Sequence, residues 1–418
     1  MQSPRTQKAS LATIVVCVAL ATLLSGCAST DGSASAPELV SRGWENPAAL
    51  APVADFDAYV AQVTQELRNH RLPFDPGMAD AELSLVAPLR TPPGPRCESG
   101  APRGIAILVH GLSDTAFAMR DLATSLSSQC FESRVLLLPG HGTRPADLMV
   151  VDHQDWLHHV EAAVRQAGRE NDVVVIAGFS LGAALAVTVA AGLPGEVDAV
   201  IGLSPAYRIS SPLLARQAGW IAAFRPWLRS GPREEFARYE AMPTLAVAST
   251  SALLQRMDAR VKRQRGLQMP WLVVQSEDDE VVDVVGNRRF FEANARDTRS
   301  ALVNYYSLQP DEVSGGRVTW LPAADATLRV VGLSHLAVHI SPGNPHYGVL
   351  GKYRNCGSTP FRTEDEVRSC RQAERLWYGA GGQSPPAGEA GARATFNPHY
   401  PDLERRIGAF LDQVVGSP

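Results

Sequence analysis

The sequence predicts an α/β fold with a mostly parallel central sheet flanked by helices, and it does so through three observations. Short, continuously apolar segments alternate with helical patterns between residues 105 and 203. Strands that are apolar on both faces are typical of parallel sheets covered by helices on both sides. The alternation stops over residues 206–268, where we find helical patterns only, and strand character resumes at 271–275. We therefore expect one large α/β-type domain at 101–418, with a helical insertion at 206–268.

The insertion is a candidate lid, because it interrupts two strands of a predicted parallel sheet. A packed helical subdomain without a gating role is the alternative.

Each expected element follows from its pattern. Apolar residues at helical spacing predict helices at 54–68, 114–128, 155–167 and 402–414, and continuous apolar segments predict strands at 105–109, 135–138, 173–177, 199–203, 271–275 and 328–331. The Gly/Pro-rich residues 379–392 predict a surface loop. No internal repeat is visible.

The composition is that of a globular protein. Of the 418 residues, 45% are hydrophobic and 20% are charged, which excludes collagen-like, disordered and multi-span membrane classes. The formal net charge is −4 and no block of Lys or Arg stands out, so we expect no nucleic-acid partner.

The N-terminus has the pattern of a secretory signal. Arg5 and Lys8 precede an apolar segment at 11–24, and Leu24-Ser25-Gly26-Cys27 follows. The apolar core is short for a membrane span, and small residues precede the cleavage point. The Leu-Ser-Gly-Cys ending resembles the bacterial lipobox, which implies cleavage after residue 26 and diacylation of Cys27. An uncleaved anchor helix is the alternative.

This resemblance predicts a lipid-anchored protein of the bacterial cell envelope. Residues 1–26 are then the lipoprotein signal peptide, 27–45 a tether and 46–100 an N-terminal extension. The acyl chains on Cys27 would hold the protein at a membrane, since each buried methylene contributes roughly 0.8 kcal/mol. Ala28, in place of Asp after the cysteine, predicts the outer membrane, facing the periplasm, in a Gram-negative host.

Four cysteines remain after the signal. In an exported chain, Cys97, Cys130, Cys356 and Cys370 predict two disulfides, although the sequence permits three pairings. We favour Cys97–Cys130 and Cys356–Cys370, of which the second closes a short loop and would contribute about 3 kcal/mol. Free buried thiols are the alternative. No Cys-x-x-Cys pair or paired His accompanies the cysteines, so we expect no zinc site.

A candidate nucleophile lies in Gly178-Phe179-Ser180-Leu181-Gly182. The Gly-x-Ser-x-Gly pattern alone is frequent by chance, but here it directly follows a predicted strand and precedes a small-residue helix. Strand, sharp turn and helix form a nucleophile elbow, in which the serine takes a strained conformation that small flanking residues tolerate. We therefore predict that Ser180 is a nucleophile and not an ordinary turn residue.

A serine nucleophile needs an orienting acid, which should follow the next strand after the insertion. Ser276-Glu277-Asp278-Asp279-Glu280 ends the strand at 271–275, so four carboxylates compete. We choose Asp279, because the orienting acid of such a site is usually followed by one variable residue and two apolar residues. Asp278 is the second candidate. The carboxylates that do not serve as the orienting acid would then be part of a solvated turn.

The base should follow the last strand. His335 comes directly after the strand predicted at 328–331, which places it on a loop that faces Ser180. His339 lies four residues further on, and we interpret it as a packing or surface residue, because His-x-x-x-His without the metalloprotease Glu is weak support for a metal.

Two backbone N–H groups are candidates for an oxyanion hole. Leu112 follows His110-Gly111 at the end of the first strong strand, and Leu181 follows the nucleophile. Each donor is worth on the order of 2.7–4 kcal/mol in a transition state. We interpret His110 as a brace of this loop and not as a catalytic residue.

These residues, in this order, resemble the α/β-hydrolases, over roughly residues 100–340. The segment Leu138-Pro139-Gly140-His141-Gly142 resembles the monoacylglycerol lipase and lysophospholipase branch, which is grouped with serine aminopeptidases of the S33 type. The resemblance implies a helical cap at the insertion and no metal or organic cofactor. The chain departs from this branch at Ser113 and Ser276, where Gly is common, and in residues 341–400, which exceed the usual C-terminal helix.

The resemblance implies a serine ester hydrolase whose substrate is an acyl-chain lipid such as monoacylglycerol or lysophospholipid. A proline-iminopeptidase-like aminopeptidase is one alternative, and it would use Glu234, Glu235 or Glu240 near the lid to bind a free amino terminus. A hydrolase fold that binds a ligand or partner without catalysis is the other.

Overall fold

The computed structural model describes residues 36–41, 55–97, 101–210, 212–231, 233–308, 316–357, 363–381 and 383–416. The predicted signal peptide, Cys27 and most of the tether lie outside these ranges. No helix within the described residues combines the length and the apolar character that a membrane span requires.

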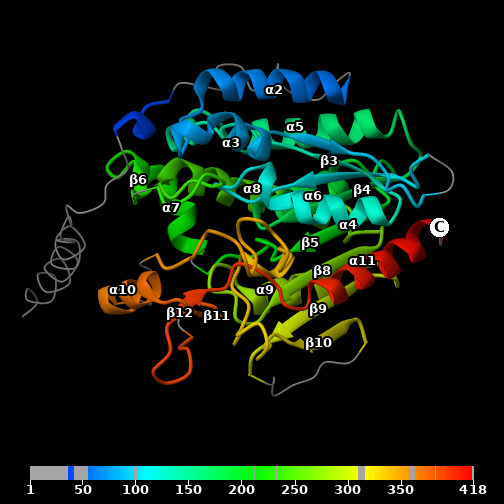
Figure 1. Ribbon diagram of the computed structural model, residues 1–418. Helices are drawn as coiled ribbons and strands as arrows, with labels where there is room; N and C mark the ends of the chain where they lie inside the picture. The colour runs from blue at the N-terminus through cyan, green and yellow to red at the C-terminus, as the bar shows by residue number, and fades with distance from the viewer. Residues whose placement is uncertain are drawn as a thin grey trace, which may run out of the picture.

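An eight-stranded sheet forms the centre of the molecule, with strand order β1-β3-β2-β4-β5-β8-β9-β10 (Figure 1). The edge strand β1 pairs antiparallel with β3, and all other neighbours are parallel. The strands are β1 (Leu89–Thr91), β2 (Ile105–Val109), β3 (Glu132–Val135), β4 (Val174–Phe179), β5 (Ala199–Leu203), β8 (Trp271–Ser276), β9 (Ala301–Tyr306) and β10 (Val318–Pro322). The predicted fold class, a mostly parallel sheet flanked by helices, is confirmed.

Helices cover both faces of this sheet. The α-helices are α2 (Phe56–His70), α3 (Ala79–Val86), α4 (Arg120–Ser128), α5 (His153–Ala167), α6 (Leu181–Gly192), α7 (Pro212–Ala222), α8 (Thr244–Arg263), α9 (Val284–Asn294), α10 (Glu364–Gln372) and α11 (Tyr400–Val415). Short 3-10 helices are η1 (Ala36–Leu39), η3 (Pro76–Met78), η4 (Ala116–Met119), η5 (Pro145–Met149) and η6 (Ala337–His339).

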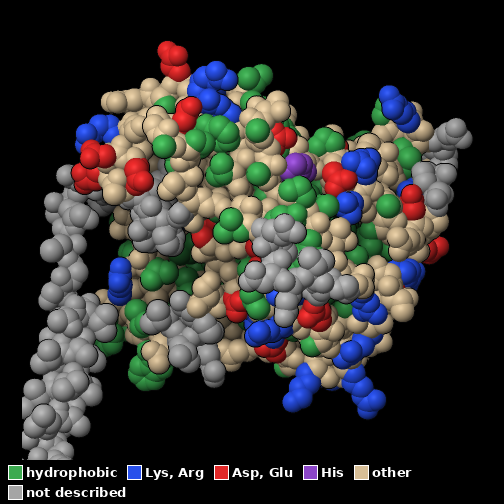
Figure 2. All heavy atoms as spheres, turned by 90° about the horizontal axis from the view of Figure 1, so that it is seen from below, with side chains coloured by type: hydrophobic (Ala, Val, Ile, Leu, Met, Phe, Trp, Pro, Cys, Tyr) green, Lys and Arg blue, Asp and Glu red, His purple; other side chains and the backbone are tan. Residues whose placement is uncertain are grey.

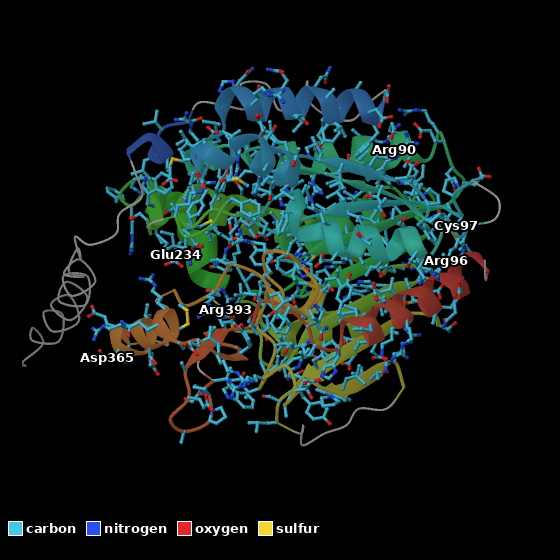
Figure 3. All side chains as sticks on the ribbon, viewed as in Figure 1. Arg90, Arg96, Cys97, Glu234, Asp365 and Arg393 are labelled. Carbon is cyan, nitrogen blue, oxygen red and sulfur yellow. A yellow bond between two sulfur atoms is a disulfide. The ribbon has the colours of Figure 1, made fainter. Side chains whose placement is uncertain are left out.

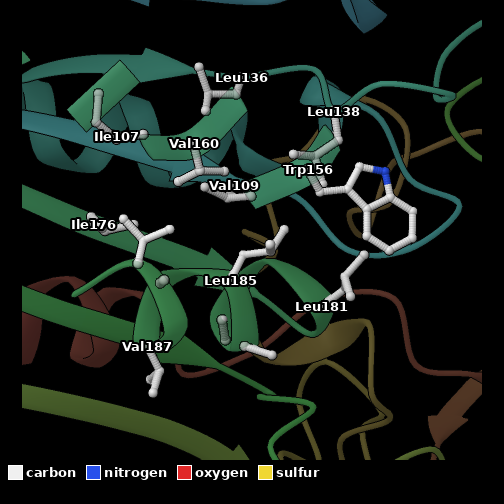
Figure 4. Close-up of a cluster of buried hydrophobic side chains, with 14 of the residues drawn as sticks. Ile107, Val109, Leu136, Leu138, Trp156, Val160, Ile176, Leu181, Leu185 and Val187 are labelled. Carbon is white, nitrogen blue, oxygen red and sulfur yellow. The ribbon is translucent and has the colours of Figure 1, made fainter. Parts of the chain in front are cut away.

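Strand β2 shows why the sheet has two cores. Ile107 and Val109 point into a cluster that also contains side chains of α2, α5, α6, α8 and α9 (Figure 4). Ala106 and Leu108 point to the opposite face, into a cluster with α4 and α11. Alternate residues of a strand face opposite sides, so a strand that is apolar throughout needs a helical layer on each side.

The expected strands differ from the observed ones mainly at the edges of the sheet. Strand β3 precedes the predicted segment 135–138, because its polar residues Glu132 and Arg134 are buried as an ion pair and hide the strand pattern. Strands β1, β9 and β10 were not expected. The strand predicted at 328–331 is absent from the sheet, since only Val330 forms isolated bridges there.

The insertion at 206–268 is only partly what the sequence predicts. It contains β6 (Trp227–Arg229) and β7 (Met242–Pro243), a two-stranded antiparallel pair, so the expectation of helical patterns alone is wrong. Its helix α8 buries Leu253, Met257 and Val261 in the core cluster that α6 also joins. Helix α8 therefore belongs to the layer that covers the sheet, and the part with the position of a lid is shorter, at 206–243.

Both predicted disulfide pairings, Cys97–Cys130 and Cys356–Cys370, are present. The second lies in residues 341–399, which we call the C-terminal insertion. This insertion also contains α10 and a small parallel sheet of β11 (Trp377–Gly379) and β12 (Gly391–Arg393), which flank the loop predicted at 379–392.

The charges are mixed on the face seen in Figure 2. Acidic and basic side chains are interspersed there among apolar ones, without a patch of a single sign.

Candidate active site

Ser180 lies at the sharp turn between β4 and α6, at the carboxyl end of the sheet. Its backbone has φ 53° and ψ −114°, a strained conformation for a residue with a side chain. A Cβ on Gly178 would clash with the backbone of Gly182, and a Cβ on Gly182 would clash with the carbonyl oxygen of Val109. The close approach of α6 to β4 and to β2 therefore requires glycine on both sides of the serine.

The structure brings Ser180, His335 and Asp279 together in one hydrogen-bonded chain. His335 Nε2 lies 2.9 Å from Ser180 Oγ, and His335 Nδ1 lies 2.6 Å from Asp279 Oδ2. The other oxygen, Asp279 Oδ1, accepts from the backbone N–H groups of Val281 and Val282 at 2.9 and 3.2 Å. Ser180 is partly exposed, whereas Asp279 is buried. This arrangement orients the imidazole with a carboxylate on one side and a hydroxyl on the other.

The four carboxylates at 277–280 are not a solvated turn. Each of them has its own partner, and only Asp279 contacts His335. The remaining pairs are Glu277 with Asn304 of β9, Asp278 with Ser307, and Glu280 with Arg393 of β12. Burial raises the pKa of Asp278, and the hydrogen bond from Ser307 opposes this effect.

The two expected oxyanion donors lie on segments that pack against each other. Gly182 approaches the carbonyl oxygens of Val109 and His110, which brings the start of α6 next to the loop at 110–112. Within the described residues, the backbone N–H groups of Leu112 and Leu181 donate no hydrogen bond. Two free donors beside a serine hydroxyl suit a developing negative charge.

His110 is buried under this loop as a neutral brace. Its Nε2 accepts from the N–H of Leu138 at 3.0 Å, and its Nδ1 lies 2.8 Å from the carbonyl oxygen of Gly111. Burial and, to a lesser extent, the neighbouring His141 hold the pKa of His110 well below its usual value. The imidazole is thus neutral, with one nitrogen accepting and the other donating.

His339 packs against the nucleophile strand and not against Ser180. Its ring lies 4.1 Å from that of Phe179, and burial lowers its pKa to about 3. Among the residues that the structure describes, no group of three or more His, Cys, Asp or Glu side chains is arranged to hold a metal ion.

A buried polar cluster between the insertion at 206–268 and the C-terminal insertion was not predicted from the sequence. Glu235 of the insertion accepts from Tyr347 Oη at 2.6 Å and from His346 Nε2 at 2.9 Å, and it pairs with Arg238 at 2.7 Å. The signal that could have found it is Asn344-Pro345-His346-Tyr347-Gly348, a departure from the branch that the chain resembles. The cluster fixes the segment 206–243 to the C-terminal insertion.

Asp114 lies beside this cluster and next to the oxyanion loop. Its side chain is buried, and this burial raises its pKa to about 7, while the charge of Arg238 opposes the shift. A buried carboxyl group therefore lies against Gly111 of the loop that carries one expected oxyanion donor.

Comparison with known proteins supports the class that this geometry indicates. The family described as "Serine aminopeptidase, S33" matches residues 100–306. A "Thermostable monoacylglycerol lipase" of Bacillus sp. (strain H-257) is 24% identical over 205 residues, which cover 48% of this chain and 80% of the relative.

Two solved structures of lipolytic proteins are also similar. One, from a study of LipS and LipT, "two metagenome-derived lipolytic enzymes", is 22% identical with a TM-score of 0.45, and the match covers 56% of this chain and 87% of that one. The monoacylglycerol lipase of Paleococcus ferrophilus is 17% identical with a TM-score of 0.43, and the match covers 52% and 88% of the two chains.

The protein has an α/β-hydrolase fold. Its residues 100–306 match the serine aminopeptidase S33 family, and part of the chain is similar to a monoacylglycerol lipase.

Proposed function

We propose that the protein cleaves acyl-chain lipid esters, such as a monoacylglycerol or a lysophospholipid, through an acyl-enzyme on Ser180. It is a serine ester hydrolase of the carboxylesterase and lipase kind. The observation that supports the mechanism best is the continuous hydrogen-bonded chain from Asp279 through His335 to Ser180.

Ser180 Oγ attacks the ester carbonyl carbon while His335 Nε2 takes the hydroxyl proton. The protonated His335 is stabilised by Asp279, whose Oδ2 accepts from Nδ1–H, and the backbone N–H groups of Leu112 and Leu181 bind the oxyanion. Collapse of this intermediate breaks the ester bond, and His335 gives its proton to the leaving alcohol. A water molecule, deprotonated by His335, then releases the carboxylic acid and regenerates Ser180.

The similar protein from Bacillus, which is named a monoacylglycerol lipase, supports the lipid substrate. The match extends over 80% of the length of that protein. Lipid attachment through Cys27, at the surface of the bacterial cell envelope, would bring the site to such a substrate. This attachment is part of the proposal, since Cys27 lies outside the described residues.

The aminopeptidase alternative has less support from the site. A free amino terminus needs an available carboxylate, but all three candidate acids already have cationic partners. Glu234, which is labelled in Figure 3, pairs with Arg371, Glu235 pairs with Arg238, and Glu240 pairs with Arg238 and Arg229. The non-catalytic alternative gives no reason for serine, acid and histidine to remain hydrogen-bonded.

The test is hydrolysis of p-nitrophenyl esters with acyl chains from two to sixteen carbons, with an aminoacyl p-nitroanilide run beside them. We expect turnover that rises from acetyl to medium or long chains and that is lost in Ser180→Ala, by about 10⁶-fold in kcat. Circular dichroism of the variant controls for folding. Much faster cleavage of acetyl and butyryl esters would contradict the lipid substrate, and release of the amine alone would favour the aminopeptidase.

A further inference from the structure

His335 lies far along the chain from the last strand of the sheet. Strand β10 ends at Pro322, and the residues before the histidine form a loop in which Val330 alone makes isolated bridges, to Asp325 and Tyr378. The sheet therefore does not deliver His335 to Ser180, and other contacts must fix the loop at 329–335.

Asp278, the neighbour of the triad acid, packs directly against this loop. Its Oδ2 lies 2.7 Å from the position that a Cβ on Gly332 would take, so the carboxyl group and the loop backbone are in close contact. The backbone N–H of Leu333 faces the same carboxyl group and lowers its pKa against the larger effect of burial. Gly332 and Leu333, three and two positions before His335, therefore lie against this carboxyl group.

Two further side chains hold Asp278 in this position. Ser307 Oγ donates to Asp278 Oδ1 at 2.5 Å and accepts from Gln383 Nε2 at 2.9 Å. Gln383 Oε1 accepts in turn from the backbone N–H of Ala380 at 2.8 Å. Asp278 therefore connects the histidine loop to the end of β9 and to the C-terminal insertion.

The C-terminal insertion also holds the loop through its backbone. The N–H of Val331 donates to the carbonyl oxygen of Tyr378 at 2.8 Å, and Ser334 Oγ donates to the carbonyl oxygen of Ala394 at 2.6 Å. The loop is thus fixed on one side by Asp278 and on the other by residues 378–394.

We propose that Asp278 is a positioning residue that, with Ser307 and Gln383, holds the loop at 332–335 so that His335 stays in reach of Ser180. Asp278 does not contact His335 or the substrate site, and it acts through the loop backbone. The inference rests on the proposed function, because it assumes that His335 is the base. A base displaced by about 1 Å can lower a rate by about 100-fold.

The main test compares Asp278→Ala with the matched control Glu277→Gln. Glu277 belongs to the same turn, but its partner Asn304 lies on β9 and not on the histidine loop. We expect Asp278→Ala to lower kcat for the best p-nitrophenyl ester by 10- to 100-fold with KM within twofold of the wild type. Glu277→Gln should leave kcat within twofold, and Asp278→Asn, which keeps an acceptor for Ser307, should restore part of the loss.

Hydrogen–deuterium exchange of the backbone amides at 331–336 gives a second readout that does not depend on activity. We expect faster exchange in Asp278→Ala and in Gln383→Ala, and wild-type exchange in Glu277→Gln. Gln383→Ala serves as the test variant if Asp278→Ala does not fold.

Unchanged exchange at 331–336 in a folded Asp278→Ala or Gln383→Ala would overturn the proposal, as would a kcat within twofold of wild type. If the wild type cleaves no ester, the proposed function fails, and the exchange experiment still decides whether Asp278 fixes the loop.

Discussion

The two halves of the candidate site owe their rigidity to different parts of the molecule. Ser180 is held by the main chain, because β4 lies in the middle of the sheet and α6 packs on β2 through glycine contacts. His335 is held mainly through side chains of an acid turn and by a C-terminal insertion. A hydrolytic site can therefore combine a nucleophile fixed by the sheet with a base fixed by local contacts, and the two should respond differently to mutation.

The largest effect on the histidine side is expected from Asp279→Asn. The amide cannot stabilise protonated His335, and it favours the wrong imidazole tautomer, so kcat should fall by about 10⁴-fold. Steady-state hydrolysis of a p-nitrophenyl ester measures this. The control is Asp283→Asn, which changes a carboxylate that caps α9 and should leave kcat unchanged. An equal loss in Asp278→Asn would contradict the assignment of Asp279.

On the nucleophile side, Gly182→Ala should destabilise the whole fold. The added Cβ would meet the carbonyl oxygen of Val109, which is backbone and cannot rotate away. We expect the free energy of unfolding in urea to fall by about 3 kcal/mol. Gly219→Ala is the matched control, since it also adds a methyl group to a helical glycine but into open space, and it should stabilise by about 0.5–1 kcal/mol. Equal stabilities of the two variants would argue against a tight elbow.

The sequence predicted the position of Ser180 more completely than the contacts that hold His335, because the first depends on a local motif and the second on residues far apart in the chain. The elbow is a local motif of strand, turn and glycine, so Ser180 and the central strands β2, β4, β5 and β8 were readable from the residues. The anchoring of His335 depends on hydrogen bonds between residues far apart in the sequence. Asp278 and Ser307 are 29 residues apart, and Ser307 and Gln383 are 76 residues apart, so no local pattern indicates these contacts. The polar strand β3, which lies next to the edge strand β1, was misplaced because a buried ion pair masks its apolar pattern.

The stability of the two halves of the site should depend on pH in opposite directions. Burial lowers the pKa of His159, beneath the nucleophile side, from 6.5 to about 3. The unfolded chain therefore takes up more protons than the folded chain between these values. The contribution of His159 is complete above pH 6.5 and is lost as the pH falls, by roughly 1.4 kcal/mol per unit. The raised pKa of Asp278 acts in the opposite direction, because its burial is less costly once it is protonated.

We expect His159→Phe to reduce the loss of stability between pH 7.5 and 4.5 by about 2 kcal/mol relative to the wild type. Urea unfolding at the two pH values measures the difference. His158→Gln, at the exposed neighbouring position, should retain the wild-type pH dependence. The interpretation is wrong if both variants change it equally.

The smallest effect is expected at Ser113, next to the oxyanion loop. Its φ is 71°, where a side chain is strained, and Gly is common at this position in the branch that the chain resembles. Ser113→Gly should therefore raise the free energy of unfolding by up to about 1 kcal/mol. Ser125→Gly, inside α4, should lower it by about 0.5–1 kcal/mol. A loss of stability in Ser113→Gly would mean that its side chain contributes more than the strain costs.

Covalent labelling of Ser180 tests the central claim most directly. The protein would be treated with a p-nitrophenyl alkylphosphonate, and the adduct located by mass spectrometry of peptides. We predict a single adduct, on Ser180, whose rate of formation falls by at least about 10³-fold in His335→Ala. An adduct on another residue, no adduct, or an unchanged rate in His335→Ala would contradict a nucleophile at Ser180 activated by His335.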